Sequence, residues 1–184
     1  HGESEANATG DDVPDPLLTE DGATQASSWR GRIGELGAEV ALVSPLRRTV
    51  QTACMAFDGT SVPMELCRHA REMWWSDRQN TMGTRAQMSG LLARLPRGRE
   101  VQEVDDALAP GAGDPRSESE SVARLRQVLL DRPESTVAVV CHWGVIHELC
   151  GASASNCEVV ECVYKESRLK VVGRYPPPGG PRTR

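Results

Sequence analysis

Three features are scarce in this 184-residue chain: aromatic side chains, long apolar runs and an excess of positive charge. The cleanest apolar run spans residues 137–141, whereas a membrane-spanning helix needs about 20 apolar residues, so we expect no membrane partner. With 21 basic and 26 acidic residues, the formal net charge of -5 offers no general field for nucleic acid. We therefore expect a cytoplasmic protein without a nucleic-acid partner, in which an anionic substrate needs a local basic pocket.

The six cysteines do not follow the spacing of a known cysteine framework. None forms a Cys-x-x-Cys pair, and their positions match neither a disulfide pattern nor a zinc site. We interpret them as reduced, mostly buried thiols, and we expect no metal and no cofactor. A redox or metal protein that uses scattered Cys and His residues stays as an alternative, which metal analysis of the purified protein would decide.

The sequence does contain an alternation of strand and helix patterns. Runs of β-type residues predict strands at 39–43, 62–68, 136–141, 157–165 and 168–173. The run at 136–141 lacks polar alternation, which is typical of a central strand covered on both faces. Helical patterns lie at 19–36, 46–57, 84–95 and from Ser117 to just before Pro133. Together they predict an α/β three-layer sandwich with a mostly parallel central sheet flanked by helices.

The remaining segments are rich in turn residues. Residues 1–16 predict a surface loop, and residues 96–116 predict an excursion over the surface. Ser44 and Pro45 are suited to the start of the helix that follows them, with Ser44 as its cap. We interpret residues 1–174 as one domain and the Pro- and Gly-rich residues 175–184 as an unstructured tail.

Residues suited to one chemical task lie in four loops, and three of these loops follow predicted strands, where parallel sheets place their ligands. These are Arg48 in the segment 44–48, Glu72, His142, and His1 and Asn7 in the opening loop. Taken singly, each has an ordinary structural reading, and we give His69 and His147 only that reading. The joint occurrence of the others at strand ends favours a functional site.

Four segments in this order resemble the signatures of the histidine phosphatase superfamily, in its phosphoglycerate-mutase-like branch. They are HGESEAN at 1–7, SPLRRTVQTA at 44–53, RE at 71–72 and VVCHWGVI at 139–146. The resemblance extends from residue 1 to about residue 163. In the family an Arg and a buried strand precede the histidine of the first signature, whereas this sequence begins at His1. We therefore expect the first strand of the sheet to be missing from the chain.

The resemblance also implies roles for individual residues. His1 matches the histidine that attacks phosphorus and becomes a phosphohistidine, and Glu72 matches the proton donor to the leaving group. Arg48 matches the arginine that binds the phosphoryl oxygens. His142 matches the second histidine of the pocket, and Asn7 matches the asparagine that reaches the phosphate.

These residue types suit phosphoryl transfer on physical grounds as well. A phosphoryl group in transfer carries negative charge on its oxygens, and the planar fork of Arg48 can hold two of them. A histidine nucleophile must be neutral at the attacking nitrogen, and neighbouring cations favour that state by lowering its pKa. A carboxyl group with a raised pKa, here Glu72, can protonate a departing alkoxide and later activate water.

We expect a phosphomonoester hydrolase that acts on a small phosphorylated molecule through a phosphohistidine. The chain is short, which leaves little room for the insertions that shield the intermediate from water in mutases. Phosphoglycerate-mutase-type phosphoryl transfer stays as an alternative. So does a catalytically impaired phosphate-binding protein, because the Arg and the strand are missing.

Two further features depart from the family pattern. Trp74 and Trp75 follow Glu72 where many relatives have a Cys-Asp-x-Gly-like element, and they either line the mouth of the site or cover the core. Trp143 stands where a small residue is common after the second histidine.

Overall fold

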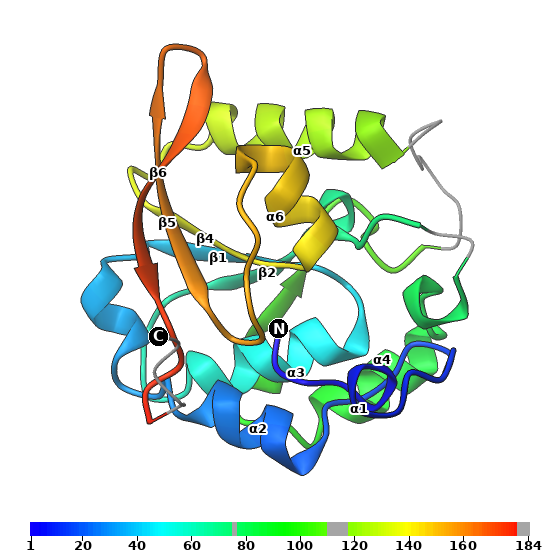
Figure 1. The fold of residues 1–184 in the computed structure, drawn as a ribbon. Helices are drawn as coiled ribbons and strands as arrows, with labels where there is room; N and C mark the ends of the chain where they lie inside the picture. Colours follow the sequence, from blue (N-terminus) through cyan, green and yellow to red (C-terminus); the bar gives the residue numbers. More distant parts are fainter. Residues whose placement is uncertain (75–76, 110–117, 180–184) are drawn as a thin grey trace.

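The computed structural model describes residues 1–74, 77–109 and 118–179 (Figure 1). Its centre is a parallel four-stranded sheet in the order β3-β2-β1-β4. A separate antiparallel hairpin pairs β5 with β6. The strands are β1 (Val40–Val43), β2 (Met64–Leu66), β3 (Val101–Glu103), β4 (Val137–Val140), β5 (Val159–Lys165) and β6 (Arg168–Tyr175). The predicted α/β fold with a mostly parallel central sheet is confirmed.

Helices cover both faces of the sheet, with α3 and α2 on one side and α5 and α6 on the other (Figure 1). The α-helices are α1 (Glu5–Thr9), α2 (Glu20–Ser27), α3 (Arg47–Ala56), α4 (Arg85–Leu92), α5 (Glu118–Asp131) and α6 (Trp143–Cys150). Short 3₁₀ helices are η1 (Ile33–Leu36), η2 (Arg68–Ala70), η3 (Arg78–Asn80) and η4 (Gly98–Glu100). Among the described residues, no helix is both long enough and apolar enough to span a membrane.

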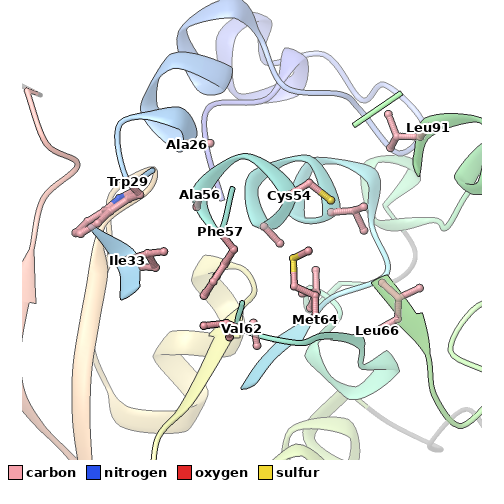
Figure 2. Close-up of a cluster of buried hydrophobic side chains, with 14 of the residues drawn as sticks. Ala26, Trp29, Ile33, Cys54, Ala56, Phe57, Val62, Met64, Leu66 and Leu91 are labelled. Carbon is pink, nitrogen blue, oxygen red and sulfur yellow. The ribbon is translucent and has the colours of Figure 1, made fainter. Parts of the chain in front are cut away.

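Strand β1 separates two apolar cores because all of its residues are apolar and buried. Ala41 and Val43 contribute to the core under α2, α3 and α4, while Leu42 contributes to the core under α5 and α6. Figure 2 shows the first core, where Phe57 from the end of α3 and Met64 from β2 lie with the side chains of neighbouring elements. This two-sided burial fixes the carboxyl end of β1, from which the loop to α3 starts.

Strand β4 lies at the end of the sheet order, so the prediction of a central position is wrong for the described chain. Its residues are half-buried, and within the described residues its outer edge pairs with no strand. An unbroken apolar run indicates that both faces are covered, but it does not report how many strands lie on either side. The strand expected before His1 is not part of this sequence.

The predicted surface excursion at 96–116 contains a strand that sequence reasoning missed. β3 pairs in parallel with β2 at the opposite edge of the sheet, and its polar Gln102 and Glu103 are exposed. An exposed edge strand tolerates polar residues, so β3 lacks the run of apolar residues by which a strand is predicted from sequence. Residues 110–116 of this segment lie outside the described residues, as does Ser117, the predicted cap of α5.

The predicted loop at 1–16 is also partly wrong, because it contains helix α1. Ser4 and Asn7 cap each other reciprocally at the start of this helix, so a polar segment gains a defined turn. The single helix predicted at 19–36 is instead α2, capped by Thr19, followed by a break and η1. Gly31 has a φ of +74° and lies in the turn that separates the end of α2 at Ser27 from η1.

Helix α3 begins later than predicted and has a different cap. Its N-cap position is Leu46, and the main-chain N–H of Arg47 donates to Oδ1 of Asp15 at 2.9 Å. Asp15 therefore serves as a cap supplied by a distant segment, which frees Ser44 for another partner. The predicted boundary between domain and tail stays a prediction, and residues 180–184 of that tail lie outside the described residues.

Candidate active site

One cavity of about 270 Å³ is lined by every residue that the sequence predicts for the site. It lies at the carboxyl edge of the sheet, where Arg48 stands in the first turn of α3 after β1 and His142 follows β4. Glu72 reaches it from the loop beyond η2, and His1 and Asn7 come from the opening segment. Residues from four separate stretches of chain therefore share one small polar cavity.

The ring of His1 is oriented by contacts on both of its nitrogens. Nδ1 lies 2.7 Å from the carbonyl oxygen of Gly2, which can only accept, so Nδ1 carries the proton. Nε2 lies 3.3 Å from Nε of Arg48, which can only donate, so Nε2 presents its lone pair. His1 is therefore a neutral imidazole with an unprotonated nitrogen beside a guanidinium.

The main chain around His1 is fixed by two elements. The N–H of Gly2 donates to the Thr52 hydroxyl on α3 at 3.0 Å, and the His1 carbonyl accepts from the N–H of Cys157 at 2.9 Å. Gly2 also needs to be glycine, because an added Cβ would lie 2.4 Å from the carbonyl oxygen of Gly22 in α2. The close contact of these two glycines holds the opening segment against α2.

Arg48 is buried, and its guanidinium is held by protein acceptors on several sides. Nη1 donates to the Gln79 carbonyl at 2.7 Å, and Nη2 donates to Oδ1 of Asn80 at 2.8 Å. Burial lowers the pKa of Arg48 to about 10, while the charges of Asp15 and Glu72 act in the opposite direction. The guanidinium is thus still charged at neutral pH and is fixed in one orientation.

His142 is fully buried and also neutral. Its Nδ1 lies 3.2 Å from Nη2 of Arg48 and therefore accepts, which leaves the proton on Nε2 to be donated to the Ser44 hydroxyl at 2.8 Å. Burial, together with the positive charge of Arg48, lowers the pKa of His142 well below its ordinary value. The rings of His1 and His142 meet edge to face with centroids 5.0 Å apart.

Glu72 is a buried carboxyl group at the wall of the cavity. Oε1 accepts from the N–H of Met73 at 2.8 Å, and Oε2 accepts a longer bond of 3.4 Å from the N–H of Gly144. Burial raises the pKa of Glu72 above its ordinary value, although these two N–H groups and Arg48 act to lower it. An added Cβ on Gly144 would lie 2.6 Å from Oε1, so a larger residue at this position would have to displace the carboxyl group.

Asn7 lies at the exposed rim of the cavity. Its Oδ1 accepts from the Ser4 main chain at 3.1 Å and from Nδ2 of Asn156 at 3.4 Å. Asn7 therefore joins helix α1 to the loop after α6, and its amide nitrogen is the atom suited to donate to an anion.

Sequence reasoning missed two residues that position the site. Asn80 is buried, accepts from Arg48 and donates to the carbonyls of Met73 and Trp74, so it connects the guanidinium to the segment after Glu72. Ser44 contacts His142, a role that the prediction of a helix cap obscured. Ser44 directly follows the β1 run, a position that could have indicated a site residue, whereas nothing in the local sequence marks Asn80.

Aromatic rings lie beside the cavity. Trp143 lines it, and its ring stacks on that of His147 at 5.1 Å and on that of Trp74 at 6.3 Å between centroids. His69 and His147 are absent from the described residues that line the cavity, so neither joins the predicted site. Trp75 lies outside the described residues. Over the described ranges, no group of three or more His, Cys, Asp or Glu side chains is arranged to hold a metal ion.

The fold and the cavity define a class: an α/β protein that presents two imidazoles and a guanidinium at the carboxyl edge of its sheet. A comparison with protein families assigns the chain to one family of this class. The chain belongs to the histidine phosphatase superfamily (branch 1), whose family profile matches residues 1–168.

Solved structures share this fold. A protein of Escherichia coli K-12 with the provisional name alpha-ribazole-5'-P phosphatase has a TM-score of 0.64 at 20% identity, over 94% of this chain and 91% of that one. A phosphoglycerate mutase of Thermus thermophilus has a TM-score of 0.59 at 22% identity, over 95% and 94%. Mycobacterial hydrolase 1 has a TM-score of 0.52 at 27% identity, over 81% and 75%. A search of curated proteins found no match to this chain.

Proposed function

We propose that the protein hydrolyses a small phosphomonoester through a phosphohistidine on His1. The observation that carries this proposal is the state of the His1 ring: Nδ1 is protonated and held by the Gly2 carbonyl, and the lone pair of Nε2 faces Arg48. A nucleophilic nitrogen beside a fixed cation is what attack on a phosphorus atom with anionic oxygens requires.

In the first step, Nε2 of His1 attacks phosphorus and the bond from phosphorus to the ester oxygen breaks. Arg48 donates to the phosphoryl oxygens, with His142 beside them and Nδ2 of Asn7 at the rim. Protonated Glu72 gives its proton to the departing alkoxide, and the alcohol leaves. The products of this step are the free alcohol, a phosphoryl group on His1 and an ionised Glu72.

In the second step, water attacks the phosphorus atom and the bond to Nε2 breaks. The Glu72 carboxylate takes a proton from the water, and inorganic phosphate leaves. His1 returns to its neutral state and Glu72 to its protonated state, so the cycle closes without a further reactant. A raised pKa suits Glu72 to both roles, because its carboxyl group remains protonated at higher pH than an ordinary glutamate.

Water is the acceptor that the cavity favours over a second substrate hydroxyl. His1 is only half-buried, and Asn7 and Trp143 at the rim are exposed, so solvent reaches the position of a phosphohistidine. A mutase must hold this intermediate away from water until the acceptor hydroxyl arrives. We accordingly expect inorganic phosphate as product and no interconversion of phosphoglycerates.

The alternative to an enzyme is a protein that binds phosphate but does not catalyse hydrolysis. Binding of phosphate alone requires Arg48 but neither a lone pair on His1 nor a buried carboxyl group at Glu72. The test is hydrolysis of p-nitrophenyl phosphate by the parent and by His1→Asn, with Glu166→Gln at the tip of the hairpin as control. We expect the His1 variant to be inactive and the control to match the parent. Equal hydrolysis by the parent and the His1 variant would contradict the proposal.

A further inference from the structure

Two stacked tryptophan rings, of which one lines the cavity, are buried in neither apolar core. Trp143 follows His142 directly and lines the cavity, and 45% of its surface is exposed. Trp74 follows the Glu72 segment and is 49% exposed. The rings are nearly parallel, with an interplanar angle of 18°. The rings stack on each other, with centroids 6.3 Å apart, and each remains partly exposed. We call this stacked pair, which lies beside the proposed phosphate site, the tryptophan platform.

The main chain and side-chain contacts hold this platform in place. Nε1 of Trp143 donates to the Ser153 hydroxyl at 2.8 Å, and His147 stacks on the same ring with an interplanar angle of 5°. Trp74 has a φ of +60°, a left-handed conformation that is unfavourable for a residue with a side chain. Its carbonyl accepts from Asn80 Nδ2 at 3.2 Å and from the Asp77 N–H at 3.0 Å. Asn80, which accepts a hydrogen bond from Arg48, thus also holds the main chain of Trp74.

Exposed indole rings are suited to a planar ligand. A ligand ring that stacks on the exposed side of the pair removes apolar surface from water, and the Nε1 hydrogen bond already orients the Trp143 indole. The tryptophan platform lies beside the cavity that holds His1, Arg48 and Glu72, so the group that reaches it is the part of the substrate attached to the phosphoryl group.

We propose that Trp74 and Trp143 bind a planar aromatic group in the alcohol part of the phosphomonoester and thereby select aromatic over saturated substrates. This inference rests on the proposed function, because it concerns the leaving group of that reaction. Stacking of one aromatic ring commonly changes affinity by about tenfold or more. We therefore expect a preference of about tenfold, expressed mainly in KM.

The test compares benzyl phosphate with cyclohexylmethyl phosphate. Both release an alkyl-type alcohol of similar size, so the chemical step is matched and only the planarity of the ring differs. The parent is expected to prefer benzyl phosphate by about tenfold in kcat/KM. Trp143→Leu and Trp74→Leu are expected to bring this ratio close to one, while Trp143→Phe retains part of it. Tyr164→Leu, which removes an exposed ring from the hairpin, is expected to keep the parent's ratio.

Both kcat/KM values in the ratio are measured on the same variant. A change in the fraction of folded protein therefore affects both values equally and leaves the ratio unchanged. A parent ratio near one, or a ratio that both leucine variants retain, would overturn the inference while leaving the proposed function standing. Calorimetric binding of benzylphosphonate and cyclohexylmethylphosphonate tests the tryptophan platform independently of hydrolysis. Tighter binding of the aromatic phosphonate in a protein that hydrolyses neither ester would support the tryptophan platform and contradict the proposed function.

Discussion

Nε of Arg48 donates to Nε2 of His1 across 3.3 Å, so the residue proposed to hold the phosphoryl group also orients the proposed nucleophile. The same guanidinium contacts the ring of His142. Since a guanidinium can only donate, both imidazoles must accept, and both are neutral. One buried cation thus fixes the protonation state of two histidines.

Replacement of Arg48 tests this arrangement. Arg48→Ala is expected to lower kcat by about 100- to 1000-fold, by analogy with removal of one donor from an oxyanion site. Arg48→Lys keeps the charge but loses the planar fork, so most of the loss should remain. Arg47→Lys is the matched control, because Arg47 is paired with Asp15 and not with the cavity residues. Steady-state hydrolysis of p-nitrophenyl phosphate measures all three variants, and a fully active Arg48→Lys would argue against a role for the fork.

Asn80 is expected to act through Arg48. Asn80→Ala removes one of the two acceptors of Arg48 Nη2 and the side-chain donor to the Trp74 carbonyl. We therefore expect kcat/KM to fall about tenfold, equivalent to one hydrogen bond of about 1.4 kcal/mol. Gln79→Ala is the control, since Arg48 uses only the main-chain carbonyl of that residue. If the loss is the same with both variants, Asn80 has no special positioning role.

Glu72 predicts a dependence on both pH and leaving group. As the general acid, Glu72 must be protonated, so hydrolysis of an alkyl phosphomonoester should fall as pH rises through its raised pKa. Glu72→Gln should abolish this fall and slow the release of the alkyl alcohol strongly. Release of p-nitrophenolate, which leaves without a proton, should be slowed much less in the first turnover. Equal slowing of both leaving groups would remove Glu72 from the role of acid.

His142 predicts a dependence of folding stability on pH. Its pKa is lowered in the folded state, so the unfolded chain binds a proton that the folded protein does not, and stability falls as pH drops below about 6.5. The parent should lose up to about 1.4 kcal/mol per pH unit more than His142→Asn over this range. Urea unfolding of both proteins at several pH values between about 5 and 7.5 measures the difference, in which other titrating groups cancel. A constant difference across this range would show that His142 does not titrate differently on folding.

The candidate site residues could be proposed from the sequence because each belongs to a short motif of the family. Arg48 and His142 also follow predicted strands, whose ends a parallel sheet places at one edge, whereas His1 is assigned only from the resemblance of residues 1–7. Asn80 could not be found in this way, since its contact with Arg48 exists only after η3 folds against α3. The same limit applied to Asp15, which caps α3 from a distant segment, and to β3, whose exposed polar residues lack a strand pattern.

The most direct test of the proposed function is to trap the phosphoryl group on the protein. The Glu72→Gln variant should form the phosphohistidine from p-nitrophenyl phosphate but hydrolyse it slowly, because it lacks the base that activates water. Quenching in alkali within milliseconds to seconds, followed by peptide mass spectrometry, locates the phosphoryl group, and the same variant carrying His1→Asn is the control. The proposed function predicts a phosphoryl group on His1 and none in the control. A phosphoryl group on another residue, or on no residue while phosphate is released, would contradict it.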